Sequence, residues 1–396
     1  MSRVAVQRVS VFSLNIPMRH VVAHASAHHA ASEPVVVAIE LTNGTEGYGE
    51  ALPRSYVTQE SVESAYEAIR TVYAPFLLAF HPSSFPEALE AIEALPWRDG
   101  FNRPSPSARA CVELALLHAV LRCYKRTLDD AVRWMGIPGF GLPGSIRQSR
   151  YSGVLGVLQP DQALRQVRKM YWGGLRHFKL KVGVPNDLVA LRRIAWYLRH
   201  PIRRGRATLR LDANGAWSKD EAIEWLSDAG DVSLSALEQP LPRGQERHLR
   251  ILRDLFDFPI MHDESLVTLE DAQELIALGV ADAFNIRISK CGGMLPSLRL
   301  AALARRSGVR LQLGCMVGET SILSAAGVRF LEVCPRVEWV EGCFGSHLLS
   351  DDVVSKAVSF GYGGRPPRLP KDRFGVTVDQ RRLRRLCPDK PLVINL

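Results

Sequence analysis

Three acidic residues near the middle of the chain recur at almost equal intervals. Asp212, Glu238 and Asp263 lie 26 and 25 residues apart, and each ends a short apolar run. An interval of about 25 residues is short for a strand–helix–strand unit of an α/β domain, but it fits one. We therefore expect the three carboxylates side by side, at the C-terminal ends of successive parallel strands. Three oxygen ligands at one rim suit a hard divalent cation such as Mg²⁺.

From about residue 150 onwards, short apolar runs alternate with helical stretches. The runs predict strands at 151–156, 177–182, 207–212, 235–238, 259–263, 283–287, 310–314 and 337–341. Ser218, with Glu221 three residues on, is typical of a capping box at the start of one intervening helix. Eight strands and seven helices predict an α/β fold, a modified (β/α)₇β TIM-type barrel over residues 145–345. The alternative is an open doubly wound sheet, whose usual glycine-rich phosphate loop is poorly matched by Gly153–Gly156.

The segments on either side of the predicted barrel have a different pattern. Residues 1–130 are expected to form an α+β capping domain, because alternating apolar runs around a turn-like Thr42–Glu46 predict an antiparallel hairpin. Helical stretches are expected near 59–80, 85–95 and 105–125. The tail, residues 346–396, is rich in Pro, Gly and Arg and is expected to return to the capping domain.

Composition narrows the class of protein. The chain has no run of 18 apolar residues and does not begin with an apolar signal peptide, so we expect a cytoplasmic protein without a membrane span. Its seven cysteines form no C-x-x-C pair, which favours reduced thiols over a disulfide framework or a zinc site. The net charge is +9, but the densest basic cluster, Arg381–Arg385, contains no aromatic residue. That cluster indicates a solvated helix face, and we expect no nucleic-acid partner.

Two lysines add a chemical direction to the acidic residues. Lys179 and Lys181 are two residues apart on the second predicted strand, so both point to the same face. In a ring of eight, the sixth strand, which carries Arg287 and Lys290, lies opposite. Lys, unlike Arg, can lose its proton where neighbouring positive charge disfavours the charged form. Lys181 is therefore a candidate general base, with Lys179 tuning it.

Each of these features also has a plain structural explanation. A lone acid at a strand end is more often a helix cap, and Asp263–Ser265 could cap a helix that begins near Thr268. Two lysines on one face could line an exposed strand edge. Together, in this order and at this spacing, they favour a functional site.

The combination resembles the enolase superfamily and, within it, the muconate lactonizing enzyme (muconate cycloisomerase) subgroup of mandelate racemase/muconate lactonizing enzyme-like proteins. The resemblance covers nearly the whole chain. It is carried by Lys179–Lys181, Leu211–Trp217, Leu237–Pro240, Asp263–Ser265, Asn285–Gly293 and Gly314–Met316. It implies an isomerase or lyase that uses Mg²⁺, with Mn²⁺ as a substitute metal.

The resemblance also implies roles for individual residues. Asp212, Glu238 and Asp263 would bind the metal. Lys181 would abstract the proton α to the carboxylate of a small-molecule substrate, while the metal holds both carboxylate oxygens as an enediolate forms. Residues expected to orient ligands or to touch the substrate are Asn214, Glu264, Lys290, Glu319, Glu341, Tyr56 and His24.

Substrate identity is expected to depend on two capping segments. Residues 17–33 contain four histidines, His20, His24, His28 and His29, and would act as a lid. Residues 53–58 contain Arg54 and Tyr56, which could meet a distal group of the substrate. We also expect a homo-oligomer.

One position departs from the subgroup. Arg287 stands where the subgroup usually has Lys. Two-base racemases need a group on each face that can give and take a proton, and Arg cannot take that role. Arg287 can still hold positive charge over a developing enolate, so one-base cycloisomerase or dehydratase chemistry is favoured. Two alternatives stay open: a racemase or epimerase of an amino-acid derivative or dipeptide with Lys290 as second base, and a metal-binding relative without catalysis.

Overall fold

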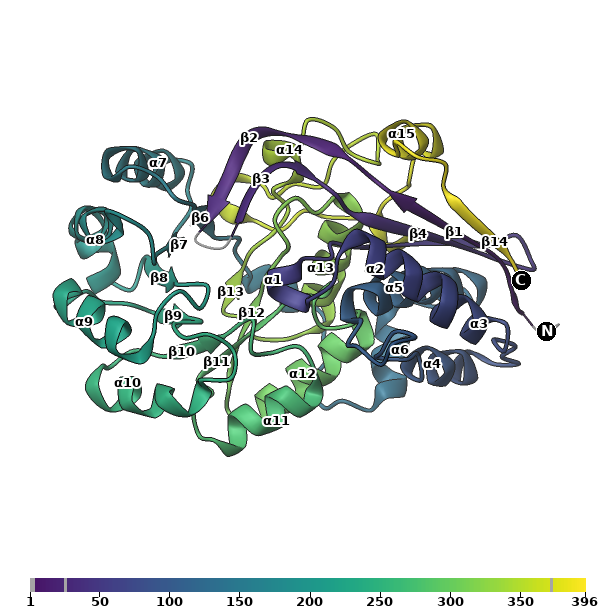
Figure 1. Ribbon diagram of the computed structural model, residues 1–396, viewed down its shortest axis with the longest axis horizontal. Helices are drawn as coiled ribbons and strands as arrows, with labels where there is room; N and C mark the ends of the chain where they lie inside the picture. The colour runs from purple at the N-terminus through teal and green to yellow at the C-terminus, as the bar shows by residue number, and fades with distance from the viewer. Residues whose placement is uncertain (1–3, 25–26, 371–372) are drawn as a thin grey trace.

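A curled parallel sheet lies in the left and middle of the molecule as Figure 1 shows it. The computed structural model describes residues 4–24, 27–370 and 373–396, the side chains of residues 21–24, 27–29 and 373 excepted. Within the described part of the chain the sheet has eight strands, which lie in chain order. They are β6 Gly153–Leu155, β7 His177–Lys181, β8 Thr208–Asp212, β9 Ala236–Glu238, β10 Ile260–His262, β11 Ala283–Ile286, β12 Arg310–Leu313 and β13 Trp339–Val340.

The first and last strands of this sheet meet. An isolated parallel bridge joins Tyr151 to Val340, and the Ser152 N–H donates to the Val340 carbonyl at 2.7 Å. The sheet is therefore a barrel. The barrel prediction is confirmed, and the open doubly wound alternative is wrong.

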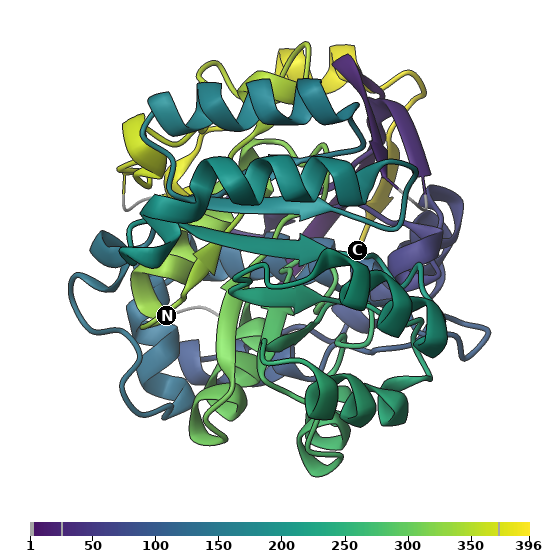
Figure 2. The ribbon, with the colours of Figure 1, turned by 90° about the vertical axis from the view of Figure 1, so that its left-hand side faces the viewer.

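Helices fill the intervals between the barrel strands and surround the sheet (Figure 2). In this part of the chain, all of which the structure describes, seven helices follow one another. They are α7 Pro160–Trp172, α8 Asp187–Arg203, α9 Lys219–Ala229, α10 Leu249–Leu255, α11 Leu269–Ala277, α12 Met294–Arg306 and α13 Ser321–Val333. The expected capping box is present, because Ser218 and Glu221 each accept a hydrogen bond from the backbone N–H of the other. Asp263 caps no helix, since α11 is capped by Thr268.

A second, antiparallel sheet is built from both ends of the chain. Its four strands lie in the order β14 Leu392–Asn395, β1 Val6–Ser13, β4 Val35–Leu41 and β5 Glu46–Ala51. The C-terminal strand β14 thus pairs with the N-terminal strand β1, and Figure 1 shows the two strands side by side. The helices before the barrel are α1 Ser55–Thr58, α2 Val62–Ala68, a π-helical turn Ile69–Tyr73, α3 Ala74–Leu77, α4 Phe85–Glu93, α5 Pro106–Cys123 and α6 Leu128–Met135. After the barrel come the short α14 Gly345–Leu348 and α15 Gln380–Leu386.

Two buried carboxylates tie this N-terminal unit to the barrel. Glu113, on α5, accepts hydrogen bonds from Met294 N–H and Leu295 N–H at 2.9 and 2.8 Å, at the start of α12. Glu50, on β5, accepts from Thr320 N–H at 2.7 Å at the start of α13. A helix N-terminus has unpaired N–H groups and a positive end, so each carboxylate is well placed there. Both helices follow barrel strands, so the contacts hold the N-terminal unit beside the C-terminal rim.

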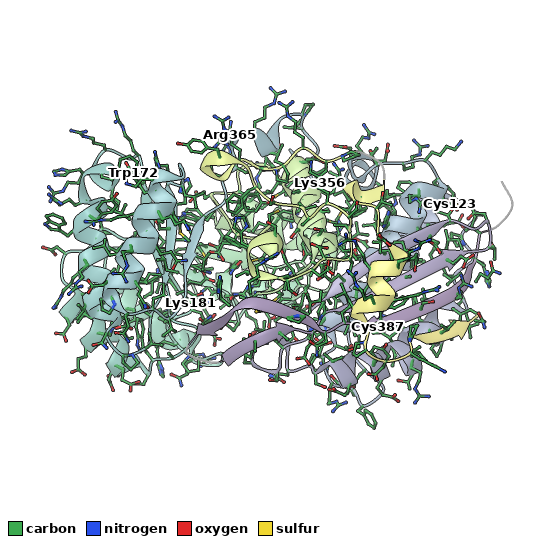
Figure 3. All side chains as sticks on the ribbon, turned by 90° about the horizontal axis from the view of Figure 1, so that it is seen from above. Cys123, Trp172, Lys181, Lys356, Arg365 and Cys387 are labelled. Atoms are coloured by element: carbon green, nitrogen blue, oxygen red, sulfur yellow. The ribbon has the colours of Figure 1, made fainter. Side chains whose placement is uncertain are left out.

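The capping segment 17–33, for which the sequence predicted no strands, contains two strands that pair as a hairpin. Strand β2 Ile16–His24 pairs antiparallel with β3 Ala27–Ser32. Ser32 Oγ donates to the Gly318 carbonyl at 2.7 Å, and Arg19 Nε donates to the Leu349 carbonyl at 2.9 Å, so the hairpin is held on loops that follow β12 and β13. In Figures 1 and 3 it reaches the end of the barrel where β6 and β7 lie.

The structure bears on two expectations from the sequence, the absence of a membrane span and the reduced state of the cysteines. Among the described residues, none of the helices has both the length and the apolar character that crossing a bilayer requires. All seven cysteines, each within the described part of the chain, are free.

Close packing of β5 on α5 yields a first prediction. A Cβ added at Gly49 would lie 2.0 Å from the Cys111 carbonyl oxygen and 2.5 Å from Ala115 N. Because both are backbone atoms of a buried helix, Gly49→Ala is expected to lower the free energy of unfolding by about 3 kcal/mol or more. The matched control is Gly327→Ala in α13, whose Cβ would meet Leu313 Cδ2 at an ordinary 3.6 Å. Urea unfolding of both variants checks this, and equal stabilities would contradict it.

Candidate active site

A cavity of about 140 Å³ opens at the C-terminal ends of the barrel strands. Lys179 and Lys181 enter it from β7, and Figure 3 places Lys181 beside the hairpin. Residues that follow the other strands complete the lining with Tyr56 of α1: Asn214, Glu264, Arg287, Cys315, Met316, Glu319, Glu341 and Phe344, with smaller neighbours. The lining thus combines several ionisable side chains with apolar ones, as in small-molecule sites.

The three carboxylates of the 25-residue pattern are fully buried at this rim. Asp212, Glu238 and Asp263 are each 0% exposed. Asp212 and Glu238 are direct partners in the pairing of β8 with β9, so both point into the barrel at the same level. Asp263 follows the last residue of β10, the strand that pairs next to β9. Burial of three negative charges is costly unless each is compensated.

Lys179 supplies much of the compensation. Its Nζ lies 2.8 Å from Glu341 Oε2 and 3.2 Å from oxygens of both Asp212 and Glu238. Burial alone would lower the pKa of Lys179, but Glu238, Glu341 and Asp212 together raise it above its ordinary value. Lys179 is therefore a fixed positive charge under the cavity.

Lys181 has a different environment, closer to the cavity. Its Nζ donates to Asn214 Oδ1 at 2.6 Å and lies 3.2 Å from Asp212 Oδ2. Asn214 Nδ2 in turn donates to Glu264 Oε1 at 3.2 Å. The Lys181 side chain is 10% exposed, against 2% for Lys179. A substrate in the cavity can therefore reach the Lys181 amine.

Asp263 is held from two sides by residues of the sixth strand and the turn after it. Arg287 forms an ion pair with Asp263 Oδ2, and its Nη2 lies 3.9 Å from Glu238 Oε1. Lys290 Nζ lies 2.8 Å from Asp263 Oδ1 and donates to the Asn285 carbonyl at 3.0 Å. Lys290 is 0% exposed and does not line the cavity, whereas Arg287 does.

The donor chemistry of this site fits a divalent cation. Three carboxylates share their basic partners: Lys179 contacts Asp212 and Glu238, and Arg287 contacts Glu238 and Asp263. A further carboxylate oxygen, Glu264 Oε2, is buried without a hydrogen-bond partner among the described residues. Carboxylate oxygens are the ligands that Mg²⁺ prefers. As the side chains stand, however, the described residues contain no group of three acidic, His or Cys side chains gathered for a metal, since basic side chains lie between them.

The carboxylates at the site differ in charge state. Burial, followed by repulsion from Asp212, raises the pKa of Glu238 to about 7, and burial with Asp263 raises the pKa of Glu264 to about 7. Burial, with Glu50 nearby, raises the pKa of Glu319 to about 8, so at neutral pH this carboxyl is largely protonated and can donate a hydrogen bond. Glu341 is the opposite case, because Lys179 and Arg210 outweigh burial and lower its pKa.

The structure brings together the expected catalytic and metal-binding residues, with most of those expected to touch the substrate. Lys179, Lys181, Asn214, Glu264, Arg287, Glu319, Glu341 and Tyr56 line the cavity, and the three carboxylates lie beneath it. Lys290 lies behind Asp263, outside the lining. The side chain of His24 lies outside the described part of the chain, and so do those of His28 and His29; His20 is exposed.

Sequence reasoning assigned no role to the groups that orient Glu238. Asn285 Nδ2 donates to Glu238 Oε1 at 2.7 Å, and Gln312 Nε2 donates to Glu238 Oε2 at 3.1 Å. Arg210, fully buried, donates to Glu341 Oε1 at 2.8 Å. Each is a polar residue at an inward position of an otherwise apolar barrel strand, and that signal could have identified them.

Comparisons with known proteins agree with this geometry. A family model described as Enolase C-terminal domain-like matches residues 162–380. The chain is 30% identical to the hydrophobic dipeptide epimerase of Roseobacter litoralis over 339 residues, 85% of this chain and 89% of that protein. It is 26% identical to the N-succinyl-L-Arg/Lys racemase of Bacillus cereus over 324 residues, 81% of this chain and 82% of that protein. The solved 2-chloromuconate cycloisomerase of Rhodococcus opacus 1CP aligns with a TM-score of 0.82 and 27% identity over 97% of this chain and all of that one. These relatives are isomerases.

The central position of Lys179 gives a prediction about stability. Lys179→Met leaves Asp212, Glu238 and Glu341 without their shared positive partner, so we expect a loss of about 3–5 kcal/mol in metal-free buffer. The matched control is Lys219→Met, which removes the contact of a partly exposed lysine with the exposed Asp220 and should cost less than about 1 kcal/mol. Thermal and urea unfolding measure the stability of both variants. Similar losses in the two would contradict the role of Lys179 as the charge that compensates the buried carboxylates.

The raised pKa of Glu319 gives a prediction about pH. Between the ordinary value for Glu and about 8, the folded protein keeps a proton that the unfolded chain has lost, so stability falls as the pH rises through this window. Glu319→Gln retains a neutral, hydrogen-bonding group. Relative to wild type it should gain roughly 1 kcal/mol per pH unit across the window. Denaturant unfolding at pH 5 and pH 9 checks this, with exposed Glu224→Gln as control. A stability difference that is the same at both values would exclude it.

Proposed function

This chain belongs to the enolase superfamily, and we propose that it removes the proton α to a carboxylate of a small-molecule substrate, with Lys181 as the base. The observation that carries the proposal is the position of Lys181. Of the two lysines on β7, Lys181 is the more exposed, and its amine lines the cavity. Contacts with Asn214 and Asp212 orient that amine. A base must lie within hydrogen-bond reach of the proton that it takes, and a substrate in this cavity meets that condition.

Asp212, Glu238 and Asp263 would hold the Mg²⁺ that members of this superfamily generally use. When bound, the cation supplies positive charge that stabilises the negative charge developing on the substrate carboxylate. Lys179 would add to this stabilisation, because it carries a fixed positive charge in contact with two of these carboxylates. The hairpin β2–β3, which the loops after β12 and β13 hold at this end of the barrel, would restrict the access of water to the cavity.

The wall opposite Lys181 favours chemistry with one base. Arg287 lines that wall from the sixth strand, and although burial lowers its pKa, Asp263 and Glu264 raise it further above an already high value. It can stabilise negative charge but cannot accept a proton. Lys290 is buried with its Nζ against Asp263 and the Asn285 carbonyl, which argues against its use as a second base. We therefore infer a cycloisomerase or a dehydratase.

A racemase or epimerase of an amino-acid derivative is the second candidate. It is favoured by the similarity to a dipeptide epimerase and to an N-succinylamino acid racemase. It requires a proton donor on the Arg287 side, either Lys290 after a rearrangement or a bound water. The stereochemistry of hydrogen exchange distinguishes the two candidates.

The proposed base leads to a prediction about hydrogen exchange. In D₂O with Mg²⁺, the protein should replace the α-hydrogen of some acid in a panel of dipeptides, N-acylamino acids, muconates and cyclic hydroxy acids. Lys181→Ala should slow that exchange by about a hundredfold or more, the usual contribution of a general base. Proton NMR and mass spectrometry measure it, with Lys219→Ala as the control for a surface lysine.

The outcomes of that experiment decide between the candidates and test the base. Exchange from one enantiomer without inversion supports one-base chemistry. Interconversion of both enantiomers supports the epimerase instead. Unchanged exchange in Lys181→Ala, or no exchange by the wild-type protein across the panel, would overturn the assignment of the base.

A further inference from the structure

The guanidinium of Arg287 lies where the charge of a metal ion would be needed. It pairs with Asp263 Oδ2 and lies 3.9 Å from Glu238 Oε1, so it bridges two of the three carboxylates. Lys290 holds the other oxygen of Asp263 at 2.8 Å. Both oxygens of Asp263 are therefore already in contact with positive charge. A divalent cation bound to Asp263 Oδ2 would lie in contact with the guanidinium of Arg287. The two positive charges would then repel each other.

The attachment of Arg287 leaves it able to move. Its Nε has no hydrogen-bond partner among the described residues, and its Nη1 contacts the thioether sulfur of Met316 at 3.8 Å, a weak acceptor. Gly314 provides space for the aliphatic stem, since a Cβ there would lie 3.0 Å from Arg287 Cγ. The side chain also lines the cavity of about 140 Å³, which is open space on the side away from Asp263 into which we infer that the guanidinium can turn.

We propose that Arg287 is a tethered counter-cation: it occupies the divalent-cation position in the metal-free protein and leaves Asp263 when the metal binds. This inference rests on the metal site of the proposed function. The displaced guanidinium then faces the cavity, where a substrate carboxylate is its natural partner. Metal and anionic substrate consequently favour each other's binding, because each stabilises the same displaced position of Arg287.

The inference predicts how removal of Arg287 changes metal affinity. Arg287→Met should bind Mn²⁺ about tenfold or more tightly than wild type in the absence of any anion, because the competing charge is gone. Electron paramagnetic resonance of free Mn²⁺ measures the dissociation constant directly. Arg299→Met is the matched control, since Arg299 pairs with Glu93 at 3.0 Å and is partly exposed. Its affinity for Mn²⁺ should equal that of wild type.

Thermal unfolding gives a second readout that does not depend on activity. In EDTA, Arg287→Met should melt below wild type, because Asp263 and Glu238 lose a positive neighbour. At saturating Mn²⁺ this deficit should vanish or reverse. The Arg299→Met control should show the same deficit in both buffers. If Arg287→Met does not fold, Arg287→Lys replaces it, with the same direction and a smaller change.

The possible failures are distinguishable. Equal or weaker Mn²⁺ binding by a folded Arg287→Met, or a melting deficit that Mn²⁺ leaves unchanged, overturns the inference while the metal site stands. Absence of Mn²⁺ binding by both wild type and Arg287→Met overturns the inference together with the metal site of the proposed function.

Discussion

Compensation of charge at the mouth of the barrel is the constraint on which the rest of the site depends. Three carboxylates, Asp212, Glu238 and Asp263, are completely buried within a small region. Lys179 and Arg287 each bridge two of them, so their cost of burial is offset by contacts with positive charge and by hydrogen bonds. A site of this kind is costly to the fold and useful to chemistry, because the same charges that must be balanced can act on a bound anion.

The fold places the charged side chains that must balance one another at the same rim of the barrel. The parallel strands β7 to β11 all end on one rim of the barrel. Side chains two residues apart on a strand point to the same face, so Lys179 and Lys181 both face inward, as do Arg210 and Asp212. Glu50 and Glu113 hold the N-terminal unit on helices that begin at this rim. The hairpin β2–β3 is carried to the substrate side by that unit.

Much of this could be predicted from the sequence, and the limits have physical causes. The eight barrel strands were predictable because apolar runs and their intervals are local patterns, and they placed Asp212, Glu238 and Asp263 at one rim. The contact of Arg287 with Asp263 could not be predicted from the sequence, because it depends on which side chains of neighbouring strands meet inside the barrel. The roles of Asn285 and Gln312 escaped for the same reason. The hairpin was missed because β3, Ala27–Ser32, has no alternation of large apolar residues and is held by its contact with the loop after β12.

The most direct test of the account is a crystal structure of the protein with Mn²⁺ and a bound substrate-like carboxylate, with the metal located by anomalous scattering. The account predicts one anomalous peak bonded to Asp212, Glu238 and Asp263, with the guanidinium of Arg287 turned from Asp263 toward the carboxylate. Lys181 should lie next to the α-carbon of that ligand. A peak elsewhere, or Arg287 still paired with Asp263 beside a bound metal, would contradict it.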